Sequence, residues 1–68
     1  SLASAAGVLS MTIDSVIWES EQNQKMYAEA DIEQATIRPL PLVGGAELRL
    51  AIRDGSKVMK RQLQLAAH

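Results

Sequence analysis

The C-terminal third of the chain has the clearest alternation of apolar and polar residues. Residues 46–53 read AELRLAIR and residues 57–65 read KVMKRQLQL, with Asp54-Gly55-Ser56 between the two runs. A period of two places alternate side chains on opposite faces of a β-strand, and a short Asp-Gly segment between two such runs is typical of a β-hairpin. The pattern therefore predicts a hairpin over 46–66.

The inward-facing row of this hairpin is apolar except for one arginine. Its members are Ala46, Leu48, Leu50 and Ile52 on the first strand and Met59, Leu63 and Leu65 on the second, with Arg61 among them. Two registers are compatible with the pattern. A two-residue Asp54-Gly55 turn pairs Leu50 with Met59, whereas a four-residue loop pairs Ile52 with Met59 and Leu48 with Leu63. Arg61 either lays the aliphatic part of its side chain along the sheet or, through its charge, hinders pairing of the sheet edge with another sheet.

Two more strands are predicted near 12–19 and 25–34, joined by the polar turn 20–24. The first run, TIDSVIWE, is rich in β-branched and aromatic residues, although Leu9, Ile13, Val16 and Ile17 also fit one face of a helix. The second run, KMYAEADIE, alternates, which predicts a buried row of Met26, Ala28, Ala30 and Ile32. Its composition favours a helix instead, with Ser20 as the cap, so a helix over 20–35 is the alternative.

The remaining segments are less regular. Residues 1–10 are small and Ala-rich, which favours a short helix or a tail, although Gly7 weakens a helix. Residues 35–45 contain Arg38-Pro39-Leu40-Pro41 and Gly44-Gly45 and are predicted to form a Pro/Gly loop. Its apolar piece, 40–43, is expected to cover an open end of the core, with an edge strand or an extended ligand for another protein as alternatives.

The fold class predicted from these elements is α+β and mostly β. We expect one small domain over 1–68, with a short N-terminal helix or tail, an acidic strand pair at 12–34, a loop at 35–45 and a basic hairpin at 46–66. Together these elements make an antiparallel sheet of about four strands. Because the sequence starts with Ser1 rather than Met, a fragment of a larger protein is compatible with it.

A chain of 68 residues has little core to stabilise it, since a domain of this size buries only about 60% of its unfolded surface. There is no Cys for a disulfide, and the single His is the last residue, so we expect no metal site. Contacts with a partner are the remaining source of stability. No apolar run approaches the roughly 18 residues that span a bilayer, so no transmembrane segment is expected. The compartment is left open.

Charge divides the chain into two halves of opposite sign. Residues 1–34 contain six acidic residues and only Lys25 as a base, a net charge of −5, whereas residues 35–68 have a net charge of +4. The simpler interpretation is that acidic and basic strands lie side by side on the outer face of one sheet, where cross-strand pairs add about 0.2–1 kcal/mol each. The alternative is that two chains meet head to tail, or that the basic hairpin binds an acidic partner.

No combination of residues points to catalysis or to a cofactor. Glu29, Asp31 and Glu33 alternate on one face of an expected exposed strand and lack the burial that would separate an acid from a base. The serines have no internal His to activate them. Gly44-Gly45 and Gly55 match neither a dinucleotide nor a phosphate-binding loop. We therefore expect no enzyme activity, no cofactor and no catalytic or metal-binding residue.

The expected function is a non-enzymatic interaction or assembly module that self-associates or docks on a larger complex. The candidate partner-binding residues are Trp18, Tyr27, Leu40, Leu42, Arg49, Arg53 and Lys60. The first alternative is nucleic-acid binding through the basic hairpin, although both aromatic residues lie in the acidic half, where phosphates are repelled. The second rests on a strand ending in Val-Ile-Trp, preceded by a helix and followed by Met-Tyr-Ala-Glu-Ala, which resembles half of the small α+β modules of secretion or pilus assembly platforms.

Overall fold

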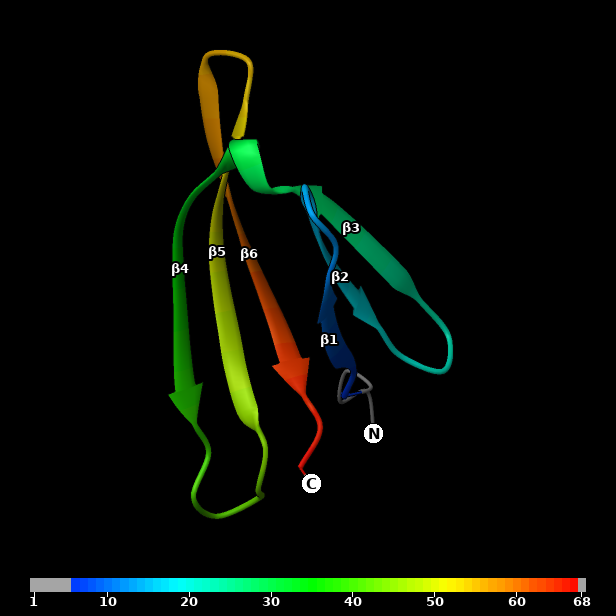
Figure 1. The fold of residues 1–68 in the computed structure, drawn as a ribbon. Helices are drawn as coiled ribbons and strands as arrows, with labels where there is room; N and C mark the ends of the chain where they lie inside the picture. Colours follow the sequence, from blue (N-terminus) through cyan, green and yellow to red (C-terminus); the bar gives the residue numbers. More distant parts are fainter. Residues whose placement is uncertain (1–5, 68) are drawn as a thin grey trace.

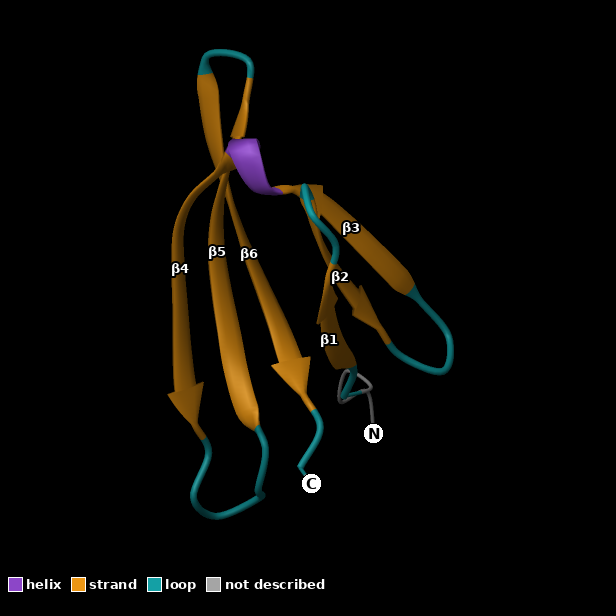
Figure 2. Cartoon of the chain, in the orientation of Figure 1, coloured by secondary structure: helices purple, strands orange, loops and turns teal. Residues whose placement is uncertain are grey.

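Nearly all of the regular secondary structure in the computed structural model, which describes residues 6–67, consists of six β-strands in two three-stranded antiparallel sheets. The first sheet contains β1 (Val8–Met11), β2 (Ser15–Glu19) and β3 (Gln24–Ala28), in that order. One turn of 3-10 helix, η1 (Glu29–Asp31), leads to the second sheet, which contains β4 (Ile32–Pro39), β5 (Ala46–Asp54) and β6 (Lys57–Leu65). Figure 1 shows the sheets splaying apart below η1, and Figure 2 shows how little helix the chain has.

The predicted hairpin is confirmed. Ile52 pairs with Met59 and Leu48 with Leu63, so the register is the one expected for the longer loop. One further pair, Asp54 with Lys57, shortens the connection to Gly55-Ser56. Gly55 has a φ of 64° and Ser56 does not have a positive φ, which fits a turn that needs glycine at its first central position.

The predicted number of strands is wrong, and the loop predicted over 35–45 is confirmed only for residues 40–45. Residues 35–39 belong to β4, in which Ala35 pairs with Leu50 and Pro39 with Ala46. Proline is tolerated here because β4 is an edge strand and Pro39 is its last residue, so the missing N–H interrupts no ladder. The short helix or tail predicted over 1–10 is wrong for residues 8–10, because Val8–Met11 pairs with β2 as a strand; residues 1–5 lie outside the described part.

The helix alternative for 20–35 is wrong, but the strand prediction for 25–34 is only partly right. β3 ends at Ala28, and η1 separates it from β4. Within β3 the predicted faces are reversed, because Tyr27 lies opposite the buried Val16 whereas Met26 is 60% exposed, but Ile32 of the same predicted row does pack against the core. Burying the aromatic ring of Tyr27 against Val16 and the core removes a large apolar area from water, which favours this face of β3.

The core lies between the two sheets. Trp18 on β2 packs with Leu48, Leu50 and Leu63, and partly buried apolar side chains surround this cluster: Leu9, Tyr27, Ile32, Ile52 and Leu65. Because the cluster combines β2 with β5 and β6, burying it holds the sheets together.

A backbone contact reinforces the core at the start of β1. Gly7 forms a parallel bridge with Leu65: its N–H donates to the Gln64 carbonyl at 2.8 Å, and its own carbonyl accepts from the Ala66 N–H at 2.9 Å. The Trp18 Nε1–H donates to the same Gln64 carbonyl at 2.9 Å. A Cβ atom on residue 7 would lie 2.4 Å from Trp18 Cε2, so only glycine fits. We call this group of Gly7, Trp18, Gln64 and Leu65 the Trp18 clamp.

Two aromatic substitutions should differ in their effect on stability. Trp18→Phe removes the hydrogen bond to Gln64 and leaves a gap in the core, and should lower the free energy of unfolding by about 1–3 kcal/mol. Tyr27→Phe should change it by no more than about 0.5 kcal/mol, because the buried Tyr27 hydroxyl has no hydrogen-bond partner. Urea unfolding of both variants at one protein concentration measures the difference, and equal losses would contradict the role of the clamp.

Candidate interaction site

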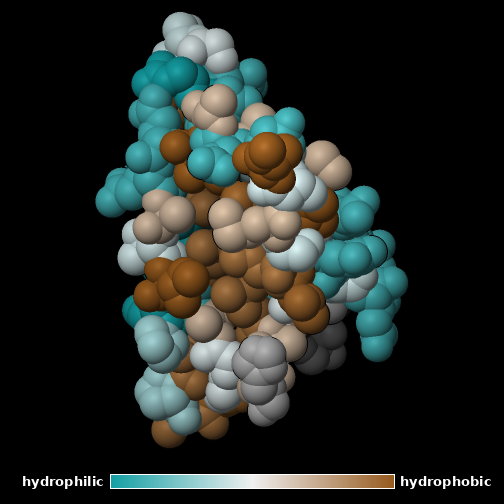
Figure 3. Space-filling view, viewed as in Figure 1, coloured by the Kyte–Doolittle hydropathy of each residue, from teal (hydrophilic) through white to brown (hydrophobic). Residues whose placement is uncertain are grey.

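Large apolar side chains are more numerous on the surface than in the core. Among residues 6–67 the buried apolar side chains are Val16, Trp18, Leu48, Leu50 and Leu63. The exposed large ones are Val8, Met11, Ile13, Met26, Ile37, Leu42, Val43 and Val58. Figure 3 shows apolar side chains gathered along the middle of one face, with hydrophilic ones at its sides and top. Single exposed apolar residues are ordinary on protein surfaces, so their arrangement decides whether they form a site.

One group of exposed apolar side chains continues the core out to an edge of the sheet. Ala35, Ile37 and Pro39 lie on the inner face of β4, and we call them the β4 edge surface. Ile37 pairs with Leu48 and Ala35 with Leu50, yet Leu48 and Leu50 are 2% and 3% exposed whereas Ile37 is 57% exposed. The apolar layer therefore ends in solvent one strand beyond the core.

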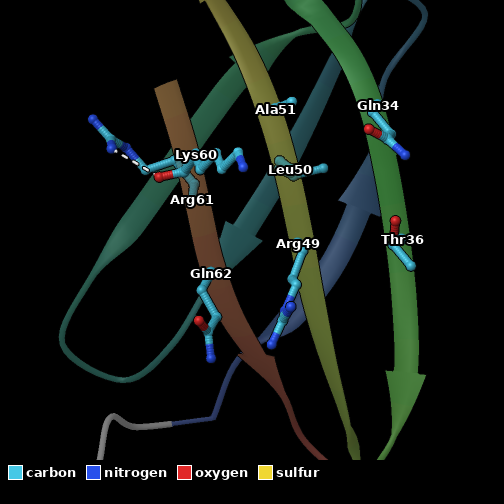
Figure 4. Close-up of a pocket in the computed structure, with 8 residues that line it drawn as sticks. All are labelled: Gln34, Thr36, Arg49, Leu50, Ala51, Lys60, Arg61 and Gln62. Carbon is cyan, nitrogen blue, oxygen red and sulfur yellow. Dashed lines mark hydrogen bonds between the residues drawn. The ribbon is translucent and has the colours of Figure 1, made fainter. Parts of the chain in front are cut away.

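The opposite face of the same sheet is polar. Its hollow is lined by Gln34 and Thr36 from β4, Arg49 and Ala51 from β5, and Lys60 and Gln62 from β6, with Leu50 and Arg61 also at its margin (Figure 4). The small side chain of Ala51 leaves this space, which holds donors of amide, hydroxyl, guanidinium and ammonium type. No carboxylate or imidazole lines it, so it has no proton acceptor of the kind used in acid–base catalysis.

Most of the arginines on this polar face are paired with carboxylates. Arg49 Nε donates to Glu47 Oε1 at 2.7 Å, and Arg38 Nη2 lies 3.6 Å from the same oxygen. Gln62 donates to the other carboxylate oxygen of Glu47. Arg53 is paired with Glu33, whose hydrogen bond and charge raise the pKa of Arg53 above its ordinary value. Much of the positive charge of the hairpin is therefore neutralised locally.

The simpler interpretation of the charge pattern is wrong, because the acidic and basic strands lie in different sheets. The first sheet with its turns and η1 carries Asp14, Glu19, Glu21, Glu29 and Asp31 against Lys25. All three ion pairs found in the described part of the chain lie within the second sheet, where Glu33 is the one member from the acidic half. None joins the two sheets across residues 6–67, so the sheets keep opposite net charges.

The structure disperses the residues that the sequence suggested for partner binding. Trp18 is buried in the core and Tyr27 is partly buried against it. Leu40 and Leu42 lie in the loop between β4 and β5, with Leu42 98% exposed. The three basic residues, Arg49, Arg53 and Lys60, share the polar face.

Sequence reasoning missed the β4 edge surface. Ile32 pairs with Ile52 and Gln34 with Ala51, so the register shifts at Glu33. This bulge puts Ile32, Ala35 and Ile37 on one face although their spacing does not alternate. The β-branched pair Thr36-Ile37 was the one local signal of a strand.

Neither a metal cluster nor a membrane helix is found among residues 6–67. No three His, Cys, Asp or Glu side chains come together there in a way that could hold a metal ion. No helix in that range is long and apolar enough to cross a membrane. No protein-family model matches the chain, and no curated protein or solved structure matches it.

Glu47 should contribute more to stability than Glu33. Its side chain is only 12% exposed and has three partners, whereas that of Glu33 is 40% exposed and has one. Glu47→Gln should lower the free energy of unfolding by about 1 kcal/mol, and Glu33→Gln by less than about 0.5 kcal/mol, since exposed pairs are screened by water. Thermal unfolding at low and high salt tests this; a larger loss for Glu33→Gln would show that the Glu47 network is not a structural unit.

Proposed function

We propose that the chain is a non-enzymatic protein-binding module whose incomplete apolar layer is covered by another protein surface, either a second copy or part of a larger assembly. The observation that carries this proposal is the row Ile37–Leu48–Leu63, which goes from exposed at the edge to buried in the core. The apolar layer is therefore covered by protein around Leu48 and Leu63 and exposed to solvent at Ile37.

The free energy gained by covering exposed apolar surface supports binding to a partner. Removing apolar surface from water stabilises by about 25 cal/mol per Å², so covering a side chain such as Ile37 contributes on the order of 1 kcal/mol. A domain of this size has a net stability of only a few kcal/mol from its own core. Binding a partner through the folded state adds to that stability by mass action.

Nucleic-acid binding is a second candidate, favoured by the placement of Arg38, Arg49, Arg53 and Lys60 on one face of the second sheet. The pairing of the three arginines with Glu47 and Glu33 weakens it, because phosphates would compete with carboxylates already in place. Trp18 and Tyr27 pack in or against the core, so neither offers a free ring for stacking.

A gel-shift titration tests the second candidate. If the polar face binds nucleic acid, DNA or RNA should be retarded, the retardation should weaken steeply with salt, and Arg49→Ala with Arg53→Ala should abolish it. Absence of a shift at low salt would eliminate this function.

The likeness to secretion and pilus modules carries no part of the proposal. That likeness requires a helix before the Val-Ile-Trp strand. The segment before that strand, Val8–Met11, is itself a strand.

The mass of the chain in solution should rise with concentration. Sedimentation velocity at several concentrations should give values above the 7.4 kDa of one chain, and Ile37→Lys should return the mass toward 7.4 kDa because a charge cannot be buried at the β4 edge surface. Ile13→Lys is the matched control, since Ile13 is 96% exposed in the loop between β1 and β2 and lies on neither outer edge.

A chain that sediments at 7.4 kDa at every concentration, and unfolds cooperatively there, would contradict the proposal. It would show that one copy is stable with its apolar layer open to water. An equal effect of both lysine variants would show that the position of the apolar residue is irrelevant.

A further inference from the structure

We propose that copies of this chain associate head to tail, with the β3 edge of one copy adding to the β4 edge of the next in antiparallel pairing. This inference rests on the proposed function and names its partner as a second copy. It makes the first sheet of one molecule continuous with the second sheet of its neighbour.

Both strands present unpaired backbone groups. β3 pairs only with β2, and β4 only with β5, among the described residues. An edge strand leaves alternate N–H and C=O groups without a protein partner, which is a template for another strand. Figure 1 shows β3 and β4 as the outer strands, running in opposite directions.

The free segments of the two edges match in length. The bulge at Glu33 and the missing N–H of Pro39 limit regular pairing on β4 to Gln34–Arg38, which is five residues. β3 also has five residues. Each strand therefore offers the other one uninterrupted ladder of the same size.

The inner faces of the two strands are compatible. Ala35, Ile37 and Pro39 lie on the core side of β4, and Lys25 and Tyr27 lie on the core side of β3, because they pair with Trp18 and Val16. Joining the edges with these faces aligned places Tyr27 and the aliphatic stem of Lys25 beside Ala35 and Ile37. This covers Ile37 and extends the apolar layer across the junction, while the ammonium group of Lys25 stays in water. β6 has an edge that is free over part of its length, but Gly7 bridges Leu65 on that edge, so a regular ladder cannot run along the whole strand.

Charge selects the heterologous arrangement over a symmetric one. Pairing β4 with β4 of a second copy would bring two sheets of net positive charge together. Pairing β3 with β4 instead brings the positive sheet next to the acidic residues in the turn and the η1 segment that flank β3, which are Glu21, Glu29 and Asp31, although β3 itself carries Lys25. Glu19 lies on the outer face beside Gln24 of β3, and Arg38 lies on the outer face of β4, so both would occupy one surface of the joined sheet. Opposite charges attract across such a contact and also set its orientation.

A head-to-tail contact uses different surfaces on the two copies, so each complex retains one free β3 edge and one free β4 edge. Repeating such a contact produces an open chain of copies, or a ring if the rotation from each copy to the next adds up to a full turn. The mass should therefore increase beyond a dimer as concentration rises.

Cysteine cross-linking tests the arrangement directly, because the native sequence contains no Cys. Ala28→Cys places a thiol on β3 and Thr36→Cys places one on β4, both at exposed outer-face positions. The two variants are treated with a short bismaleimide separately and as a mixture. Ser56→Cys, in the hairpin turn away from both edges, is the control in each mixture.

The expected result is a cross-linked dimer from the mixture of Ala28→Cys and Thr36→Cys and none from either variant alone or with Ser56→Cys. Cross-linking of Thr36→Cys with itself would overturn the head-to-tail arrangement and leave self-association standing. A mass that rises with concentration without any cross-link between Ala28→Cys and Thr36→Cys would also overturn the head-to-tail arrangement and leave self-association standing. A chain that stays monomeric, as measured by sedimentation, and forms no cross-link would overturn this inference together with the self-associating form of the proposed function.

Discussion

The structure depends on the Trp18 clamp. The two sheets are each only three strands wide, and a single indole from β2 fills the space between them while its N–H bonds the Gln64 carbonyl of β6. Gly7 lets the backbone pass against the ring and bonds the same carbonyl. Because the cluster around this ring is the main apolar contact between the sheets, a change at Trp18 or Gly7 affects the whole molecule.

The position of the clamp also explains which part of the apolar layer is exposed to solvent. The first sheet covers the inner face of the second around Leu48, Leu50 and Leu63, but β4 lies one strand farther out and its inner side chains stay in water. The polar face on the other side of that sheet consists of charged, amide and hydroxyl side chains, which water can solvate. The β4 edge is therefore a place, within residues 6–67, where the apolar layer of the core continues into solvent.

The hairpin could be predicted from sequence because the relevant forces are local. Apolar and polar residues alternate over 46–53 and 57–65, and the turn between them contains a glycine with a positive φ. These local features favour the hairpin without any contact to the rest of the chain. The faces of β3 could not be predicted, since they depend on whether Tyr27 or Met26 meets β2. β4 was missed because the bulge at Glu33 breaks its alternation and Pro39 suggests a loop. The division into two sheets depends on the long-range contact of Trp18 with Gln64, which no local pattern contains.

The same limits apply to the interaction site. The sequence pointed to large aromatic and basic residues, but Trp18 is needed in the core and Arg49 and Arg53 are paired. The division of charge, by contrast, was visible from the residues alone. Its meaning changed with the fold, because most of the acidic residues lie in the first sheet and its turns, most of the basic residues lie in the second, and Glu33 with Arg53 is the ion pair that joins the two halves in the described part of the chain.

Amide hydrogen exchange, measured residue by residue at increasing protein concentration, tests most directly whether the β4 edge is open in one copy and covered by another. The outward-facing amides of Gln34–Arg38 should exchange rapidly in dilute protein and become protected as concentration rises, while those of β5, flanked by β4 and β6, stay protected throughout. Protection of the β4 amides that does not change with concentration would contradict the open edge.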